Sequence, residues 1–253
     1  MTRSLKLTLA FDGTDYVGWQ RQSNGPSVQA AVEAAWLAVT GEDARIAGSS
    51  RTDAGVHALG MVASVDTQSR LPAKTLLRAL NANLPHDIAA TDVCQAFDGF
   101  HAIEHAVGKR YRYVIQDGRI PDVVARRYCW HVPQRLDDQA MRRAAQALVG
   151  RHDFASFQSS GSERKSTIRT VTDVQLERAA GPLFDALHFE IAADGFLYNM
   201  VRAIVGSLVR IGRGAHDAQW LAAALAARDR RRAGPTAPPQ GLFLLRVDYP
   251  AAD

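Results

Sequence analysis

Hydrophobic residues recur along most of the chain either at every second position or at every third to fourth position. This alternation of periods predicts short strands and amphipathic helices in turn. Near the start, Leu5, Leu7 and Leu9 alternate with polar or small residues before the turn FDGT, which predicts a half-buried strand. Ser27 then precedes apolar residues at helical spacing that end at Gly41, which predicts a helix capped at both ends.

The same two patterns continue to the end of the chain. Further helices are expected over residues 72–85, 139–149, 196–211 and 218–228. Further strands are expected at MVASVD, IAATDVCQAF, RYRYVIQ, TVTDVQLER, LFDALHFEIA and LFLLRVDY. In RYRYVIQ the period of two places Tyr111, Tyr113 and Ile115 on one face.

The order of these elements indicates the fold class. Strand, helix, strand, helix and strand follow one another up to about residue 105, and a similar order follows, without a legible sequence repeat. The prediction is an α+β fold of two related halves, residues 1–105 and 106–253, with helices packed on a mostly antiparallel sheet. The basic segment SSGSERKSTIR, residues 159–169, is predicted to be a loop, either a solvated connection or a flap that touches phosphates.

Composition places the chain among soluble globular proteins. It has 253 residues, of which 47% are hydrophobic and 22% charged. No apolar run approaches the ~20 residues of a membrane-spanning helix, and no signal peptide is evident, so a cytoplasmic location is expected. Lys and Arg exceed Asp and Glu by 30 to 26, with arginine dominant, which weakly favours a nucleic-acid partner.

Motifs for metals and cofactors are missing from the sequence. Cys94 and Cys129 are isolated, so two free thiols are expected and no zinc site. His101 and His105 are spaced four apart, but no third ligand accompanies them. Because GxxxxGK[ST], GxGxxG and GxSxG are also missing, neither a metal nor a small-molecule cofactor is expected.

The densest polar cluster is GSSRTDAGVHALG, residues 48–60. It brings Arg51, Thr52, Asp53 and His57 together among small residues, with Gly55 free to turn the backbone and the Thr52 hydroxyl placed to brace the turn. Asp-Ala-Gly is common in ordinary turns. The same carboxylate can also act in catalysis as a nucleophile or as a base, so both interpretations stand on the local pattern alone.

The longer string RTDAGVHA resembles the catalytic loop of pseudouridine synthases of the tRNA pseudouridine synthase A type. Other segments match this family in the same order along nearly the whole chain: FDGTDYVGWQRQ, ALNANLP, FHA, KRYRYVI, MVRAIVGSLVRIG and TAPPQGLFL. The resemblance implies the pseudouridine synthase fold, in which the sheets of two related halves join and Asp53 lies in the cleft between them. It also implies an isomerase that needs no cofactor.

The resemblance also implies roles for four residues. Asp53 occupies the position of the family's catalytic aspartate, whether it attacks the sugar, attacks the base or moves protons. Tyr111 occupies the position of the aromatic residue that lies against a base flipped out of the RNA. Arg202 matches the basic position that pairs with the aspartate, and Arg51 is placed to contact a phosphate or to help eject the base.

Neighbouring residues are expected to play supporting parts. Tyr113 is expected to pack in the core, on the same face as Tyr111. The segment from Gln20 to Gln22 is expected to contact RNA backbone. Two residues depart from the family pattern: Ser50 replaces a glycine and so demands ordinary backbone angles, and Ile103 replaces an arginine, for which Lys109 or Arg110 are candidate substitutes.

By the same resemblance the substrate is tRNA, at uridines around positions 38, 39 and 40 of the anticodon stem-loop. The family implies a homodimer in which one subunit orients the tRNA and the other reacts. Two alternatives remain: a non-catalytic tRNA-binding protein of the same fold, and a glycosidase that uses Asp53 to release free uracil. A turnover assay on unmodified tRNA distinguishes the binding protein, because it would leave uridine in place. Mass spectrometry distinguishes the glycosidase, because isomerisation leaves the mass of the RNA unchanged.

Overall fold

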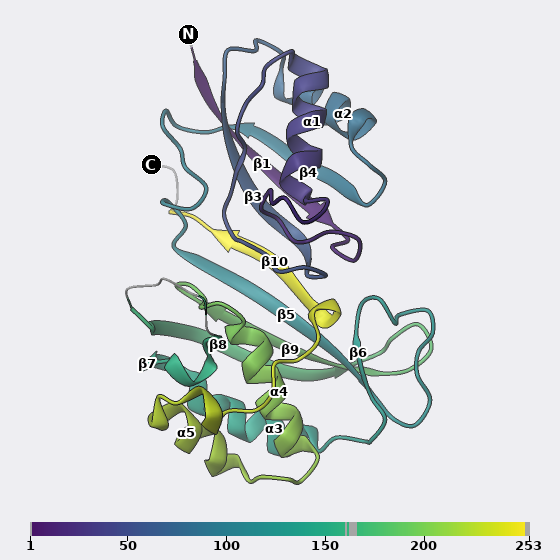
Figure 1. The fold of residues 1–253 in the computed structure, drawn as a ribbon, viewed down its shortest axis with the longest axis vertical. Coiled ribbons are helices and arrows are strands. Elements are labelled where there is room, and N and C mark those ends of the chain that lie inside the picture. The colour runs from purple at the N-terminus through teal and green to yellow at the C-terminus, as the bar shows by residue number, and fades with distance from the viewer. Residues whose placement is uncertain (1, 160, 162–165, 251–253) are drawn as a thin grey trace. The chain divides into compact units, whose positions relative to one another are not determined.

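The computed structural model describes residues 2–159, 161 and 166–250 (Figure 1). The chain forms two compact units, one comprising Met1–Val107 with Phe243–Asp253 and the other Gly108–Leu242. The predicted halves, 1–105 and 106–253, differ from these units in assigning the C-terminal strand to the second half. Residues 160 and 162–165 of the predicted basic loop lie outside the described residues.

The first unit is built on a sheet with the strand order β4, β1, β3, β10. Its strands are β1 (Arg3–Phe11), β3 (His57–Thr67), β4 (Ile88–Gln95) and β10 (Leu242–Asp248), and the short β2 (Ala47–Gly48) pairs with β3. β1 runs antiparallel to β3 and β4, whereas β10 runs parallel to β3. Leu5, Leu7 and Leu9 are fully buried, so the alternation predicted for the first strand is confirmed.

Two helices, α1 (Val28–Thr40) and α2 (Ala73–Asn83), pack against each other beside this sheet (Figure 1). The Ser27 hydroxyl accepts a hydrogen bond from the Ala30 N–H at 3.3 Å and caps the start of α1. Gly41 ends the helix with a φ of +73°, and its N–H donates to the Leu37 carbonyl at 2.8 Å. Both predicted caps of this helix are confirmed.

The second unit has an antiparallel sheet with the order β5, β9, β8, β7. Its strands are β5 (Gly108–Asp117), β7 (Gly150–Asp153), β8 (Ile168–Ala179) and β9 (Ala186–Ala193), and the short β6 (Trp130–Val132) runs parallel to β5. Three helices, α3 (Asp138–Ala145), α4 (Met200–Gly212) and α5 (Ala218–Ala227), pack against one another. The predicted α+β class, with mostly antiparallel strands, is confirmed.

Two helix boundaries differ from the predictions by about one helical turn, and the others by at most two residues. The helix expected from residue 196 begins at Met200, because Asn199 before it has a φ of +60°, outside the α-helical range. The helix expected up to residue 149 ends at Ala145, followed by a 3₁₀ turn over Gln146–Leu148. Hydrophobic spacing does not separate a final α-turn from a 3₁₀ turn, because both keep similar residues on the buried face.

The remaining sequence predictions concern single side chains and membrane helices. Cys94 is half-buried and Cys129 buried, and both are free thiols, as expected. Tyr111, Tyr113 and Ile115 share the buried face of β5, which confirms the predicted register. Among the described residues, no helix has both the length and the apolar character required to cross a membrane.

Candidate functional site

Asp53 lies in a tight turn directly before β3. The Val56 N–H donates a hydrogen bond to the Asp53 carbonyl at 3.2 Å. Gly55, the third residue of this turn, has a φ of +75°, which glycine adopts without the steric cost that a side chain brings. Asp53 itself is half-buried. The predicted turn and its dependence on Gly55 are confirmed.

A distant segment of the chain, residues 12–19, packs against this turn. The Trp19 N–H donates to the Thr52 carbonyl at 3.2 Å, and the Gly55 N–H donates to the Tyr16 carbonyl at 3.3 Å. A Cβ at Gly18 would lie 2.2 Å from the Thr52 carbonyl oxygen, and Gly18 has a φ of +108°. Only a glycine therefore allows this close approach.

A second glycine of the same segment supports the residues that follow Asp53. A Cβ at Gly13 would lie 2.0 Å from the Val56 carbonyl oxygen. The Gly13 N–H donates to Nδ1 of His57 at 3.0 Å, and the buried His57 ring stacks on Phe243 with 4.8 Å between ring centroids. His57 thus anchors the end of the Asp53 turn to the sheet.

The sequence pattern did not reveal this support. The only local signal is the pair of glycines in FDGTDYVG. A glycine in a loop more often marks a simple turn, and its contact with a segment some 40 residues away becomes visible only in the folded chain.

Two predictions concern the residues just before Asp53. The structure contradicts the one on the Thr52 hydroxyl and agrees with the one on the backbone of Ser50. The Thr52 hydroxyl is buried and has no hydrogen-bond partner among the described residues, so the prediction that it braces the turn is wrong. The Thr52 carbonyl makes the bracing contact with Trp19 instead. Ser50 is not among the described non-glycine residues with positive φ, as expected for a serine in place of glycine. Arg51 is exposed and forms no ion pair within the described part of the chain.

Tyr111 and Tyr113 lie on β5 in the second unit and have different surroundings. Tyr111 is buried and meets the ring of Phe196 edge-on at 5.0 Å. The fully buried Tyr113 donates its hydroxyl hydrogen to the Pro238 carbonyl at 2.7 Å. Burial raises the pKa of Tyr113, and the positive charge of Arg202 opposes this rise. Tyr113 is therefore a packing residue, as predicted.

Arg202 lies in the first turn of α4. Its Nε donates to the Ala237 carbonyl at 2.8 Å, and its Nη1 donates to Oδ1 of Asn199 at 2.7 Å. The Arg202 carbonyl accepts from the Ala237 N–H at 3.0 Å. The guanidinium is thus held in one orientation by the start of α4 and by the Pro-rich segment.

The four predicted site residues divide between the two units. Asp53 and Arg51 belong to the first unit, whereas Tyr111 and Arg202 belong to the second. In the second unit, β5 and α4 present Tyr111 and Arg202 from a sheet and from the helix beside it. Each residue lies on or beside a regular element, which is how proteins usually hold functional groups in place.

Two arginines considered for RNA contacts are paired with carboxylates. Arg110 contacts Asp173 at 2.7 Å and Glu190 at 3.2 Å. Burial lowers the pKa of Arg110, but the hydrogen bonds that Arg110 donates to these two carboxylates outweigh it, so the net shift is upward. Because the negative charges of Asp173 and Glu190 neutralise its guanidinium, Arg110 is a poor substitute for the arginine missing at position 103. Arg21 is more exposed and lies 3.5 Å from Glu33.

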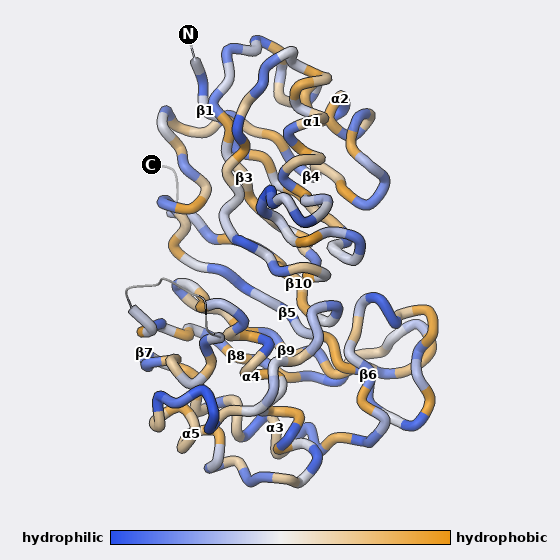
Figure 2. Tube along the Cα trace, in the orientation of Figure 1, coloured by the Kyte–Doolittle hydropathy of each residue, from blue (hydrophilic) through white to orange (hydrophobic). Residues whose placement is uncertain are grey.

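The arginine run at residues 228–232 is also largely engaged within its own unit. It forms a strongly hydrophilic stretch beside α5 (Figure 2). Arg228 lies 3.2 Å from Asp153, and Arg231 lies 2.9 Å from Asp229. Arg230 donates to the Gly234 carbonyl at 2.7 Å. The local density of arginine therefore overstates the positive charge available to a ligand here.

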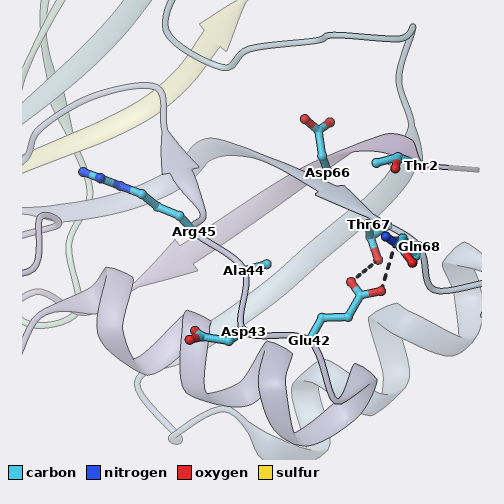
Figure 3. A pocket seen from close by; sticks show the side chains of 8 residues that line it. All are labelled: Thr2, Glu42, Asp43, Ala44, Arg45, Asp66, Thr67 and Gln68. Carbon is cyan, nitrogen blue, oxygen red and sulfur yellow. Dashed lines mark hydrogen bonds between the residues drawn. The ribbon is translucent and has the colours of Figure 1, made fainter.

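One cavity of the first unit has the wrong charge for RNA. Its described charged lining residues are three carboxylates, Glu42, Asp43 and Asp66, and one arginine, Arg45 (Figure 3). The Glu42 carboxylate accepts hydrogen bonds from the Thr67 hydroxyl at 2.5 Å and from the Gln68 N–H at 3.0 Å, so it is used in holding the end of β3. Three carboxylates outnumber the single arginine and would repel a phosphate, so we do not assign this cavity to a nucleic acid.

The two histidines considered as metal ligands lie in a turn and not on a helix. Nδ1 of His105 accepts a hydrogen bond from the His101 N–H at 2.9 Å, so this nitrogen is used within the turn. Among the described residues, no group of three or more His, Cys, Asp or Glu side chains has the arrangement needed to hold a metal ion.

Comparison with known proteins finds relatives over almost the whole chain. A family model described as tRNA pseudouridine synthase matches residues 8–103 and 144–250. A protein of Moorella thermoacetica named tRNA pseudouridine synthase A is 48% identical over 247 residues, covering 97% of this chain and 99% of the relative. Proteins of the same name from Acetivibrio thermocellus and Sinorhizobium fredii are 46% and 42% identical, covering 98% and 96% of this chain and 100% and 98% of the relatives.

Proposed function

Because the chain belongs to the tRNA pseudouridine synthase family, we propose that Asp53 is the carboxylate that carries its reaction. The protein is an isomerase that converts uridine in tRNA to pseudouridine. In this reaction the bond from the ribose C1′ to N1 of uracil breaks, the base rotates, and C1′ joins C5. The proton leaves C5 and N1 gains one, so no oxidant, reductant or group donor is consumed.

The observation that carries the assignment of Asp53 is the way its turn is held. Two glycines, Gly13 and Gly18, bring residues 12–19 into direct backbone contact with residues 52–56. An ordinary surface turn needs no such support. A catalytic carboxylate does, because reacting groups must keep their positions to within a fraction of an ångström.

Three further side chains complete the proposed site. Tyr111 stacks against the flipped uracil, and Arg202 pairs with Asp53 and keeps the carboxylate ionised. Arg51 binds a phosphate next to the target nucleotide. In support, Tyr111 and Arg202 are both held in one orientation, by Phe196 and by Asn199 with Ala237 respectively. Arg51 is exposed and has no carboxylate partner among the described residues.

The proposed substrate is the anticodon stem-loop, at uridines 38, 39 and 40, and the proposed assembly is a homodimer. One subunit would orient the tRNA while the other reacts. Phosphate contacts read the shape of a folded RNA and not its bases, which explains how one enzyme can accept several positions and many tRNAs. Because the substrate of the family is tRNA, we also propose a cytoplasmic location.

The direct test is turnover on a tRNA transcript without modified bases. We expect pseudouridine to appear in the anticodon stem-loop while the mass of the RNA stays constant, without added metal or cofactor. A tRNA that is bound but keeps all its uridines would favour a non-catalytic binding protein. Release of free uracil would instead favour a glycosidase.

A further inference from the structure

A second cavity of the first unit, with a volume of about 390 Å³, begins beside Arg51. Its floor is the pairing of β2 with β3, in which Ala47 lies opposite Ser64 and Gly48 opposite Ala63. We call it the β2 cavity. Its size is within the ~300–1,000 Å³ of typical small-ligand sites.

The walls of the β2 cavity are fixed before any ligand arrives. On one side the Ala102 N–H donates to the Ser64 hydroxyl at 3.1 Å, which holds the loop of residues 100–103 against β3. On the other side a Cβ at Gly48 would lie 2.2 Å from the buried Trp19 ring, so glycine lets the indole lie directly on β2. A site with fixed walls does not lose binding energy in ordering its own loops.

The charges around the β2 cavity suit a phosphate. Arg45 and Arg51 line it, both are exposed, and neither forms an ion pair within the described residues. Figure 3 shows the Arg45 side chain extending away from the carboxylates of Glu42 and Asp43. Asp66 is the one acidic side chain among the described lining residues, and its Oδ1 accepts a hydrogen bond from the Ser4 hydroxyl at 2.6 Å. Two arginines and one carboxylate thus line the β2 cavity.

The position of the β2 cavity places its ligand close to the reacting nucleotide. Arg51 is two residues before Asp53, and two residues of chain span at most about 7 Å. An RNA strand that brings a uridine to Asp53 therefore passes the mouth of the cavity. Apolar side chains, including the exposed Ile103, line the same space and can lie against a ribose or a base.

We propose that the β2 cavity is a subsite for a nucleotide that flanks the target uridine, with Arg45 as a phosphate-binding residue. This inference rests on the proposed function. Arginine forms paired hydrogen bonds with phosphate oxygens, and such contacts position an RNA without reading its sequence. Arg45 supplies the positive charge that position 103, occupied by isoleucine in this chain, does not supply to the same cavity.

The test compares four full-length proteins: the unchanged chain, Arg45→Gln, Arg70→Gln, and the double variant Arg45→Gln with Ile103→Arg. Arg70 is an exposed arginine of the same unit outside the β2 cavity, so its variant removes the same charge elsewhere. The measurements are the Kd for unmodified tRNA over a range of salt concentrations, and kcat and KM for pseudouridine formation. Thermal unfolding checks that each variant is folded.

For Arg45→Gln we expect Kd at low salt to rise by roughly tenfold and KM to rise with it, with a smaller change in kcat. The dependence of log Kd on log salt should become shallower by about 1, the loss of one phosphate contact. The double variant should regain the affinity and the salt dependence of the unchanged chain, because an arginine at position 103 would return a positive charge to the same cavity. If Arg45→Gln binds tRNA as Arg70→Gln does, the subsite is refuted. If the unchanged chain forms no pseudouridine, the proposed function fails instead.

Discussion

At the scale of single residues, two tyrosines on one face of β5 have different roles. The hydroxyl of Tyr113 is bonded to the Pro238 carbonyl, and a Cβ at Gly241 would lie 2.6 Å from its ring. Tyr113 therefore joins β5 to the segment before β10. Tyr111, two residues earlier, is held by the edge of Phe196, and we assign it to the base of the target uridine.

Replacement of Tyr111 by leucine tests that assignment. Stacking on a base is worth roughly 1–3 kcal/mol, so we expect Tyr111→Leu to lower kcat/KM by about 5- to 150-fold. Tyr113→Phe is the control, since it should cost about 1–3 kcal/mol of stability by leaving the Pro238 carbonyl without its partner and should keep kcat/KM. Equal kinetic losses in the two variants would argue against stacking by Tyr111.

Sequence alone located Asp53 and its turn, but not what holds them. RTDAG contains both the carboxylate and the glycine that the turn requires, so the signal is local. The support comes from Gly13 and Gly18, which act through contacts between segments far apart in the chain. The local pattern also does not show that the Thr52 hydroxyl is buried without a hydrogen-bond partner among the described residues.

At the scale of elements, the segment of residues 12–19 positions the Asp53 turn. Gly18→Ala tests this role, with Gly41→Ala as a matched control. Both glycines have positive φ, so alanine should cost each about 1–2 kcal/mol of stability. Only at Gly18 does the new Cβ meet a backbone atom, the Thr52 carbonyl oxygen, whereas nothing lies within 4 Å at Gly41.

We therefore expect Gly18→Ala to lower kcat by about 100-fold, because displacement of a catalytic group by ~1 Å has an effect of that order. Gly41→Ala should unfold at a lower temperature with kcat preserved. Steady-state kinetics gives kcat for both variants, and thermal unfolding gives their stability. Full turnover by a folded Gly18→Ala protein would show that the segment does not set the position of Asp53.

The end of β5 is joined to its neighbours by the buried carboxylate of Asp117. It lies 2.7 Å from Nη1 of Arg178 on β8 and accepts the Leu136 N–H at 2.8 Å, just before α3. Burial raises the pKa of Asp117, but the bonds from Arg178 and Leu136 outweigh it, so the net pKa is below its ordinary value of 3.8. The stabilisation is thus complete above this value and is lost as the pH falls toward the lowered pKa.

Acid unfolding of the unchanged chain and of Asp117→Asn tests this junction. At neutral pH the variant should lose about 3 kcal/mol of stability, because the charged Arg178 would keep only the longer contact with Asp138, at 3.6 Å. The difference between the two proteins should narrow as the pH falls from 3.8 toward the lowered pKa of Asp117, because the unfolded chain takes up the proton before the folded chain does. A difference that stays constant down to pH 2 would contradict the ion pair as the source of stability.

Element boundaries marked the limit of sequence-based inference. The caps of α1 could be predicted because Ser27 and Gly41 form their hydrogen bonds with residues of the same helix, three or four positions away. The start of α4 was not, because an asparagine in the left-handed conformation interrupts a pattern that otherwise continues from Phe196. Periodicity reports which residues are buried, and Leu197 and Met200 are both buried on either side of that interruption.

At the scale of the whole molecule, the loop between β5 and β6 is the surface we expect to meet a second copy of the chain. Ile120, Val123 and Val124 are exposed there. The loop is nevertheless well held, because the buried Asp122 accepts the N–H groups of Val124 at 3.0 Å and Ala125 at 2.9 Å. Apolar side chains displayed on a fixed loop are typical of protein–protein contacts.

Substitution of one of these side chains tests the proposed homodimer. We expect the unchanged chain to sediment with twice the mass of one chain and Val124→Asp to sediment as a monomer, because a carboxylate would be buried in an apolar contact. Val149→Asp, at another exposed valine of the same unit, should remain dimeric. A monomeric unchanged chain at micromolar concentration would refute the homodimer.

The function of the whole chain was predictable because its motifs are spread from end to end. RTDAGVHA alone is eight residues, but six further segments fit the same family in order, and relatives match over almost the whole chain. The class of fold followed from periodicity. The grouping of residues 243–253 with the first unit did not, because no local pattern shows which strand β10 will pair with.

The most direct test of the account is pseudouridine formation by Asp53→Asn, a change that keeps the size of the side chain and removes its charge. We expect this variant to bind unmodified tRNA with a Kd close to that of the unchanged chain and to form no pseudouridine in a single-turnover assay. Retained conversion of uridine by Asp53→Asn would contradict the assignment of Asp53 as the catalytic carboxylate.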